Sequence, residues 1–213
     1  FFPRLTPAVH DGAAATGAAV VQTLHNYRLI CAGAMLMRDG HVCEDCLTGS
    51  RLSGVVHRCY RGSVAGSIAV TVMQNRARRA GTWERSVDRF IALTDFARGK
   101  FTEGGLPSER IVVKANAIPW MAAETGIARN GALFVGRLSP EKGGRTLLDA
   151  WTQLGDVPLT VIGDGPERAP AERLARELGL EQHVTFLGKQ DHVERIFPLA
   201  HVLLLPSELE SFG

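Results

Sequence analysis

Short apolar runs recur at regular intervals in the second half of this sequence, and each gives way to glycine, proline or charged residues. Between these runs lie stretches with the helical spacing of apolar residues. Alternating strands and helices of this kind predict βαβ units around a parallel sheet. Ligands of open α/β sheets bind beyond the carboxyl ends of the strands, so the residues after each run are candidate site residues. The expected strands are residues 133–135, 159–162, 184–187 and 202–205, and the expected helices are residues 146–154, 167–178 and 192–199.

The first half of the sequence also alternates, but it contains two segments without regular periodicity. Residues 38–62 are rich in Gly, Cys, Asp and Arg, and we expect irregular structure there. Residues 119–131 lack periodicity and contain Pro119, Gly126 and Gly131, which predicts a linker between two domains. The strands expected before this linker are residues 18–24, 89–94 and 111–114.

Two helices are expected between these strands. Val64, Ile68 and Val72 recur at the spacing of one helix face, which predicts a helix from residue 63 onward. Asp95 is expected to cap a second helix, and Gly104 is expected to end it.

Length and composition set limits on the class of protein. The 213 residues can form one large domain or two small ones. With 45% hydrophobic and 22% charged residues, the chain can bury a sizeable core. A net charge of +2 gives no electrostatic case for nucleic-acid binding. No apolar run approaches the roughly 20 residues that a membrane-spanning helix needs. The sequence does not begin with Met, and its first residues do not resemble a signal peptide, so we expect both ends to be cut from a longer protein.

A loop with two cations follows the expected strand at residues 133–135. It runs from Gly136 to Gly143 and contains Arg137 and Lys142, five positions apart. Two cations beside exposed backbone N–H groups suit a diphosphate, and the glycines let the backbone approach it. The loop lacks the Gly-Lys-Ser/Thr ending of a P-loop. The alternative is a solvated turn with two surface cations, and the loop alone leaves both interpretations open.

Two further loops follow expected strands. Gly163-Asp164-Gly165 lacks the third glycine of a dinucleotide fingerprint, so a tight βα turn is the favoured interpretation. Glu208 and Glu210 follow the last expected strand, where carboxylates can accept hydrogen bonds from sugar hydroxyls. The alternative is a pair of solvated loop acids, which we favour for Glu208.

Taken together in this order and spacing, the pieces resemble the retaining glycosyltransferases of family 4, also called glycosyl transferases group 1. The resemblance covers nearly the whole chain. It departs from the family pattern at Ala115-Asn116, where Pro-Asn is usual. It is strongest at residues 135–143, 161–167, 184–188 and 206–213, and it extends to residues 23–27 and 94–98.

The resemblance implies an α/β fold of the GT-B type, with two Rossmann-like domains and parallel sheets, both incomplete in this chain. Residues 1–118 would be part of the N-terminal, acceptor-side domain, with a Cys-containing insertion at residues 31–59. Residues 119–131 would be the linker, and residues 132–213 part of the domain that binds the nucleotide-sugar donor. A chain cut in this way is expected to bind the donor poorly or not at all and to be inactive by itself.

Roles for individual residues follow from the same resemblance. Arg137 and Lys142 match the pair that holds the donor diphosphate, and Glu210 matches the first Glu of the E-x7-E motif that contacts the donor sugar or ribose. The second Glu of that motif would fall beyond the end of this chain. The turn at Gly188 and Lys189 matches the region that usually lines the nucleotide base. The residues expected to bind the donor are Gly136, Arg137, Lys142, Asp164, Gly165, Gly188, Lys189, Glu210, Phe212 and Gly213.

His25 is the candidate catalytic residue of the acceptor-side domain, and Glu210 is the candidate of the donor domain. His25 lies at the end of an expected strand, where polar residues of similar enzymes face the acceptor and the transferring sugar. The alternative is a structural His that caps the turn.

The four cysteines form a pattern of their own. Cys31, Cys43, Cys46 and Cys59 are spaced C-x11-C-x2-C-x12-C. A C-x2-C pair flanked by two distant cysteines can supply four thiolates to one structural zinc ion. The alternative is buried or unrelated free thiols. A redox C-x-x-C is less favoured, because Cys43 does not open a helix after a strand. The resemblance implies no catalytic metal.

The combined interpretation is a fragment of a retaining hexosyltransferase, active in polysaccharide or glycolipid assembly. Its partners would be a UDP- or GDP-sugar donor and a sugar or lipid-linked acceptor, with no nucleic acid. It is expected in the cytoplasm, with peripheral contact at the inner face of the membrane as one option. Arg76, Arg78 and Arg79 could make that contact, although a solvated helix end is the favoured interpretation of these arginines. The alternatives are a non-catalytic nucleotide- or sugar-phosphate-binding protein of the same fold and an NAD-dependent oxidoreductase, which the broken fingerprint disfavours.

Overall fold

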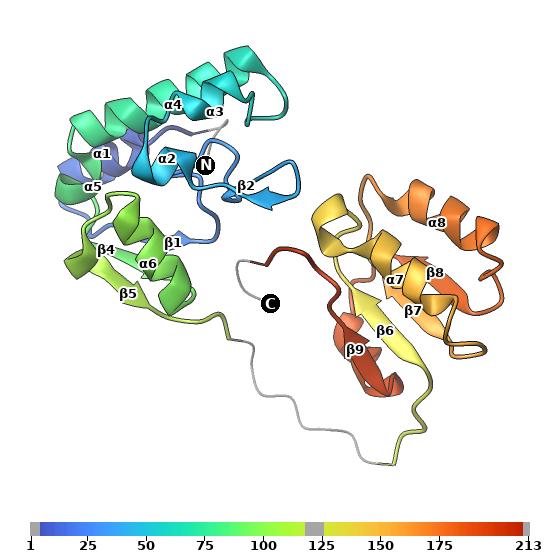
Figure 1. The fold of residues 1–213 in the computed structure, drawn as a ribbon. Helices are drawn as coiled ribbons and strands as arrows, with labels where there is room; N and C mark the ends of the chain where they lie inside the picture. The colour runs from blue at the N-terminus through green and yellow to red at the C-terminus, as the bar shows by residue number, and fades with distance from the viewer. Residues whose placement is uncertain (1–4, 118–125, 211–213) are drawn as a thin grey trace. The chain divides into compact units, whose positions relative to one another are not determined.

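The computed structural model describes residues 5–117 and 126–210. These residues belong to two compact units, an N-terminal one that ends at Ala117 and a C-terminal one that contains residues 126–210 (Figure 1). Each unit has its own parallel sheet and its own cluster of buried apolar side chains.

The N-terminal unit is built on a three-stranded sheet. Strands β1 (Val21–Leu24), β4 (Arg89–Ala92) and β5 (Ile111–Val113) are parallel in the order β1-β4-β5. The predicted strands are therefore confirmed, with shorter bounds. Helices α1 (Ala8–Ala15) and α5 (Thr82–Arg85), which the sequence analysis did not predict, also belong to this unit.

Two short helices and a hairpin occupy the segment that we expected to be irregular, and that expectation was wrong. Strands β2 (Met37–Arg38) and β3 (His41–Val42) pair in an antiparallel hairpin. Helices α2 (Asp45–Thr48) and α3 (Ser53–Val56) follow, each only one turn long. Elements this short carry too few residues to show a period in the sequence.

Helix α4 (Val64–Arg79) confirms the predicted helix, and the Ser63 hydroxyl caps it by accepting a hydrogen bond from the Gly66 N–H. Its apolar stripe, however, lies on the solvent side: Val64, Ile68 and Val72 are 44%, 46% and 57% exposed.

The buried face of α4 is instead largely polar. The Gln74 amide donates to the Arg28 carbonyl at 2.6 Å, and the Ser67 hydroxyl accepts from the Tyr60 N–H at 3.0 Å. Buried polar side chains that have hydrogen-bond partners are tolerated. The spacing of apolar residues alone therefore does not identify the buried face of this helix.

The helix after β4 begins one residue earlier than predicted. Helix α6 (Asp95–Glu103) is capped by Thr94, whose hydroxyl accepts from the Ala97 N–H at 3.0 Å, and Asp95 lies in the first turn. The prediction that Asp95 is the cap was therefore wrong, although both side chains suit the position. The predicted end at Gly104 is confirmed.

The C-terminal unit is a four-stranded parallel sheet in the order β8-β7-β6-β9. Its strands are β6 (Ala132–Val135), β7 (Leu159–Ile162), β8 (Val184–Gly188) and β9 (Val202–Leu204).

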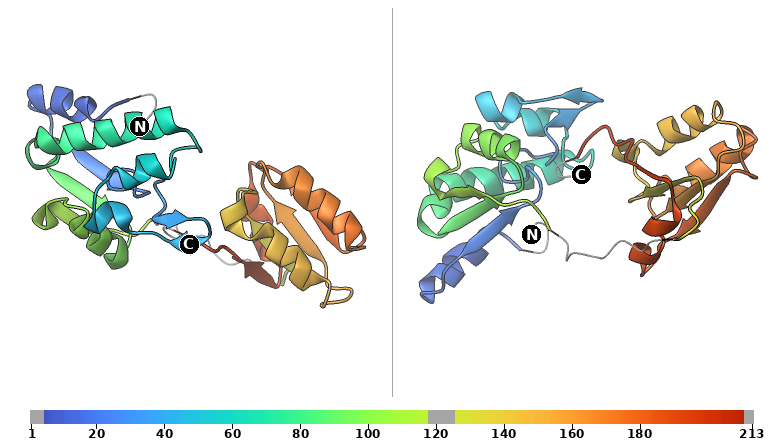
Figure 2. Two further views of the ribbon diagram at one scale, coloured as in Figure 1. Left: turned by 45° about the horizontal axis from the view of Figure 1, so that its top comes forward. Right: turned by 90° about the horizontal axis from the view of Figure 1, so that it is seen from below.

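Helices α7 (Gly144–Trp151) and α8 (Arg168–Glu177) lie side by side on one face of this sheet (Figures 1 and 2). They bury Leu148 and Trp151 of α7 and Ala175 of α8 against Phe134 and Val161. All four strands of this sheet are parallel, so their carboxyl ends lie at the same edge.

The helix predicted at residues 192–199 does not form. Two 3₁₀ turns stand in its place, η3 (Val193–Arg195) and η4 (Phe197–Leu199). Pro198 explains the break, because it has no N–H for a helical hydrogen bond and its ring clashes with the preceding turn. The predicted linker lies partly outside the described residues, and its last residues pack on the C-terminal unit, where the Asn130 N–H donates to the Leu199 carbonyl.

Candidate functional site

Three loops meet at the carboxyl edge of the C-terminal sheet, and we call them the strand-end loops: residues 136–143, 163–167 and 205–210. They follow β6, β7 and β9. Backbone hydrogen bonds tie the first two together, from the Leu138 N–H to the Asp164 carbonyl and from the Glu167 N–H to the Leu138 carbonyl. The Glu208 N–H donates to the Glu141 carbonyl at 2.9 Å and joins the third loop to the first.

Glycines make this close approach of the loops feasible. A Cβ atom on Gly163 would lie 1.8 Å from the Gly136 carbonyl oxygen, and one on Gly143 would lie 2.1 Å from the Pro206 carbonyl oxygen. Both have positive φ, 138° and 69°, which glycine adopts without strain. Gly165 approaches the Leu138 carbonyl in the same way. The glycines that the sequence analysis assigned to ligand approach are thus needed first for contact between loops.

A cation and a carboxylate from two of these loops form an ion pair. The Lys142 ammonium lies 2.5 Å from Glu210 Oε1, and the Ser207 hydroxyl donates to the same oxygen at 2.7 Å. The Lys142 and Glu210 side chains are 26% and 28% exposed, so solvent still reaches the pair. Burial alone would raise the pKa of Glu210, but the hydrogen bonds from Lys142 and Ser207 outweigh it and hold this pKa below its ordinary value.

Arg137, the other predicted diphosphate ligand, is exposed. In the described part of the chain its side chain makes no ion pair. A cation without a partner, beside one that is paired with a carboxylate, leaves this loop with surplus positive charge at the edge of the sheet.

The turn that follows β8 lies next to the β7 loop. The Gly163 N–H donates to the Gly188 carbonyl at 2.9 Å, and the Arg168 guanidinium covers Gly188 closely enough that a Cβ there would lie 2.9 Å from Nη1. Arg168 is held by Glu172 at 2.9 Å, while Lys189 is exposed. The sequence analysis missed Arg168, whose place at the start of the helix after a G-x-G turn was the available signal.

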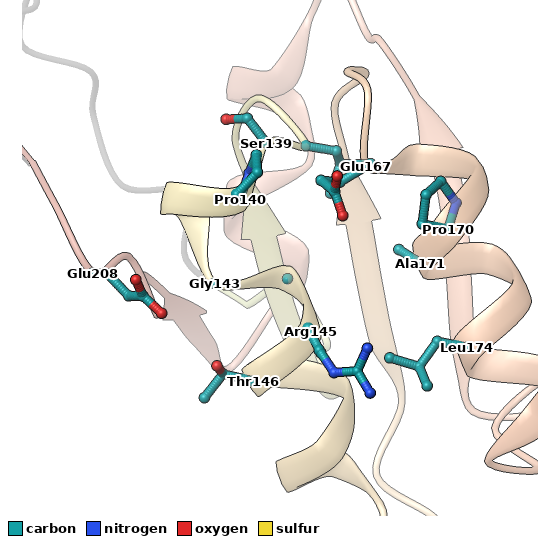
Figure 3. Close-up of a pocket in the computed structure, with 12 residues that line it drawn as sticks. Ser139, Pro140, Gly143, Arg145, Thr146, Glu167, Pro170, Ala171, Leu174 and Glu208 are labelled. Carbon is teal, nitrogen blue, oxygen red and sulfur yellow. The ribbon is translucent and has the colours of Figure 1, made fainter. Parts of the chain in front are cut away.

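A pocket of about 280 Å³ lies between α7 and α8, beside the first strand-end loop. Figure 3 shows the Arg145 side chain extending toward Leu174 in this pocket. Its lining includes Ser139 and Glu208 but none of Arg137, Lys142 and Glu210, so it is separate from the cation–carboxylate pair. The lining residues are Leu138, Ser139, Pro140, Gly143, Gly144, Arg145, Thr146, Glu167, Pro170, Ala171, Leu174 and Glu208.

His25 follows β1 in the N-terminal unit and is exposed. It lines a pocket of about 360 Å³ together with Gln22, Asn26 and Arg28 from the same strand end. His10 of α1 closes this pocket, and burial lowers the pKa of its imidazole. The pocket offers several hydrogen-bonding groups, as a sugar hydroxyl would need, but its role as an acceptor site stays a prediction.

The predicted zinc ligands all lie in the N-terminal unit, and all four are free cysteines. Within residues 5–117 and 126–210, no three His, Cys, Asp or Glu side chains stand in a ready-made metal-binding arrangement. The zinc site therefore stays a prediction. Two predicted donor residues, Phe212 and Gly213, lie outside the described residues.

Comparison with known proteins shows a similarity over part of the chain. Residues 125–213 match the family model described as Glycosyl transferases group 1. The chain is 45% identical over 58 residues to N-acetyl-alpha-D-glucosaminyl L-malate synthase of Bacillus anthracis, covering 27% of this chain and 15% of that protein. It is 40% identical over 87 residues to D-inositol 3-phosphate glycosyltransferase of Mycolicibacterium gilvum, covering 38% of this chain and 20% of that protein. The matches thus span less than a quarter of the length of these relatives.

Solved structures agree with this result at the level of the fold. HepE of Anabaena, in complex with UDP, superposes with a TM-score of 0.61 at 21% identity, over 97% of this chain and 52% of that chain. TarM of S. aureus superposes with a TM-score of 0.55 at 16% identity, over 60% of this chain and 27% of that chain.

The predicted fold is therefore confirmed: it is that of the GT-B glycosyltransferases. Over residues 125–213, the C-terminal unit is similar to the glycosyl transferases group 1 family. Among the described residues, no helix combines the length and the apolar character that crossing a bilayer requires.

Proposed function

We propose that this chain is part of a retaining hexosyltransferase that uses a UDP- or GDP-sugar as donor. The observation that carries the proposal is the Lys142–Glu210 pair at the edge where the strand-end loops meet. The group 1 family match of residues 125–213 supports it. Two neighbouring structures, HepE in complex with UDP and glucose and HepE in complex with UDP-glucose, also support it, although they are similar to this chain in fold alone.

Binding of the donor would rearrange this pair. A diphosphate carries more charge than one carboxylate, so Lys142 would move from Glu210 to the phosphate oxygens, and Arg137 would join it. Glu210 would then be free to accept a hydrogen bond from a hydroxyl of the donor sugar or ribose. The other predicted donor residues, Asp164 and the Gly188–Lys189 turn, would face the rest of the nucleotide.

The proposed reaction exchanges one bond at the anomeric carbon of the donor sugar. The bond to the diphosphate oxygen breaks, and the acceptor hydroxyl oxygen forms its bond on the same face, while its proton leaves with the diphosphate. Arg137 and Lys142 would neutralise the negative charge that grows on the departing diphosphate, so we propose no catalytic metal. His25 would position the acceptor or the transferred sugar.

The proposed acceptor is a sugar or a lipid-linked sugar, in polysaccharide or glycolipid assembly in the cytoplasm. Contact with the inner face of a membrane would bring the enzyme to a lipid-linked acceptor. The exposed stripe of α4, with Ile68 and Val72 beside the basic end at Arg76 and Arg79, suits an anionic lipid surface.

The main alternative is a non-catalytic protein of the same fold that binds a nucleotide or a sugar phosphate. It shares the strand-end loops but needs no transfer step. Binding experiments alone cannot separate the two, so transfer of labelled sugar to an acceptor is the deciding assay once the donor base is known.

Calorimetric titration with UDP, GDP, ADP and NADH tests the proposed donor site. We expect one nucleoside diphosphate to bind, and the double variant Arg137→Ala, Lys142→Ala to lose that binding. Arg145→Ala is the matched control, because it removes a cation of the neighbouring pocket from the adjacent helix. Binding of NADH alone, or diphosphate binding that only Arg145→Ala abolishes, would contradict the site assignment and place the ligand elsewhere.

A further inference from the structure

We propose that Cys31, Cys43, Cys46 and Cys59 bind one structural zinc ion as four thiolates, which fixes the insertion at residues 31–59. The proposal is independent of the transferase activity, because metal content is measured without it. Spacing in the sequence suggested the ligands, and the structure adds two observations: how the four segments fold together and what charges surround them.

The backbone folds the four cysteine segments back onto one another. The Cys43 N–H donates to the Leu36 carbonyl at 2.9 Å, so the β2–β3 hairpin returns Cys43 to the segment that carries Cys31. The Cys59 N–H donates to the Gly54 carbonyl at 3.0 Å, and this ties the end of α3 to its start.

Two glycines pack directly against the cysteines. A Cβ on Gly33 would lie 3.8 Å from Cys31 Sγ and 3.7 Å from Cys59 Cβ, so these two cysteines flank the same glycine. A Cβ on Gly54 would lie 3.8 Å from Cys46 Sγ. Cys31 and Cys59 are thus neighbours although they are far apart in the sequence, and Cys46 lies beside a glycine that also packs against Ala32, the residue after Cys31.

The environment of Arg51 indicates that an anion is missing nearby. Arg51 is only 8% exposed, and its Nη2 donates to the Gly104 carbonyl at 3.0 Å. Its Nε and Nη1 are buried and have no hydrogen-bond partner among the described residues. A buried charge without partners is costly, so an anion is expected near it.

Cys46 is the group nearby that can supply this negative charge. Burial and then Arg78 lower the pKa of Arg51, while Cys46 acts in the opposite direction. A thiolate at Cys46 would therefore stabilise the Arg51 guanidinium.

Two more arginines stand near the other thiols. Arg38 forms an ion pair with Asp45 at 2.9 Å, and Cys43 and Cys59 also lie close enough to act on it. Arg28 is partly buried and lies close enough to Cys31 to interact with it. Four thiolates around one Zn²⁺ carry a net charge of minus two, and cations near the site suit this charge.

Zinc binds cysteine as the thiolate, so binding releases the thiol protons, and zinc affinity should fall as the pH falls.

Small side-chain movements are required to close the site, because the described residues hold no ready-made ligand set. Zinc–sulfur bonds are about 2.3 Å long, so the sulfur atoms must turn toward a common point. The elements that carry them allow this: Cys46 lies in α2, which is four residues long, and Cys31, Cys43 and Cys59 lie in turns or loops.

Zinc content of the intact chain, purified with zinc in the medium and without a metal-binding tag, is the first test. We expect one zinc ion per chain, and tetrahedral thiolate spectra after replacement by cobalt. Each of Cys31→Ser, Cys43→Ser, Cys46→Ser and Cys59→Ser should weaken zinc binding at least tenfold in competition with a chelator. His41→Ala and His57→Ala, in the same insertion, are the matched controls and should keep the zinc.

Each of the following three outcomes would overturn the proposal. A chain without zinc whose four thiols all react with a thiol reagent contains free cysteines only. A chain without zinc whose thiols are missing and whose mass is lower by two hydrogens per pair contains disulfides. Zinc that survives all four Cys→Ser changes is bound elsewhere. A Cys→Ser variant can lose zinc because it partly unfolds. Adding zinc back to the wild-type apoprotein therefore tests zinc binding separately, in a chain whose four cysteines are intact.

Discussion

The strand-end loops of the C-terminal unit and the insertion of the N-terminal unit are both candidate sites, but they are stabilised in opposite ways. Backbone groups of neighbouring strand-end loops bond directly to each other, and glycines allow the contact. In the insertion, arginines surround four thiols, and Arg51 keeps two buried donors without partners among the described residues. The first site therefore forms without a ligand, whereas we expect the second to be completed by one.

The largest effect should come from adding a single methyl group between two strand-end loops. In Gly163→Ala the new Cβ would lie 1.8 Å from the Gly136 carbonyl oxygen, at a φ of 138°. We expect the C-terminal unit to lose at least about 3 kcal/mol of stability, since both the collision and the backbone strain oppose the native state. Urea-induced unfolding measures the loss.

Gly155→Ala separates the two causes. Gly155 also has a positive φ, 61°, but no atom lies within 4 Å of its added Cβ. The strain alone should cost about 1 kcal/mol. Equal losses in the two variants would mean that contact between the loops does not limit this edge of the sheet.

A smaller effect is expected for Arg51→Met, and its sign should depend on whether zinc is bound. Without zinc, the change removes a buried charge that lacks partners, so stability should stay the same or rise. With zinc, it removes a cation beside Cys46, so we expect a roughly tenfold loss of zinc affinity, equivalent to about 1.4 kcal/mol. Arg58→Met, an exposed cation of the same insertion, is the control. Unchanged zinc affinity in Arg51→Met would show that this guanidinium does not compensate thiolates.

The contrast between the strand-end loops and the insertion also explains which features could be predicted from the sequence. The strands of both sheets and the family resemblance were recognisable, because buried parallel strands are continuous apolar runs and their ends carry Gly and charge. The pairing of Lys142 with Glu210 joins residues 68 positions apart, which no local pattern specifies. The helices and the hairpin within the insertion were missed because they are only one turn or two residues long. The face of α4 was misjudged because Gln74 and Ser67 bury polar groups that find backbone partners.

Next in size is the effect of the Lys142–Glu210 pair on ligand binding. Lys142→Met should weaken binding of a nucleoside diphosphate at least tenfold, since a phosphate ligand is lost. Glu210→Gln should strengthen binding of the free diphosphate about two- to threefold, since Lys142 no longer has a competing carboxylate. Glu208→Gln is the control, because that carboxylate is exposed and its side chain has no hydrogen-bond or ion-pair partner within the described ranges. Calorimetry at neutral pH measures all three.

The pH dependence gives the same pair a second test. The pKa of Glu210 lies below its ordinary value in the folded chain, so the pair stabilises the fold above the ordinary pKa of about 4.5. This contribution is lost as the pH falls through the lowered pKa. Wild type and Glu210→Gln should therefore converge in stability at acidic pH and differ at neutral pH. A constant difference across the titration would mean that Glu210 is not ionised in the pair.

The smallest stability effect should come from the exposed stripe of α4. Ile68→Ser combined with Val72→Ser should change stability by less than about 0.5 kcal/mol per site, because both side chains are already in solvent. Val70→Ala, at a residue with 0% exposure on the same helix, should cost about 2 kcal/mol. A large loss in the double Ser variant would mean that the stripe is covered within the protein.

If the stripe instead meets a lipid surface, the same double variant should lose cosedimentation with anionic vesicles while its stability is unchanged. Arg76→Ala with Arg79→Ala should weaken that binding about thirtyfold, since each basic residue near an anionic surface contributes about 1 kcal/mol. Zwitterionic vesicles are the control for the charge. Vesicle binding that survives both double variants would assign membrane contact to another face, and α4 would then owe its exposed apolar residues to helix formation alone.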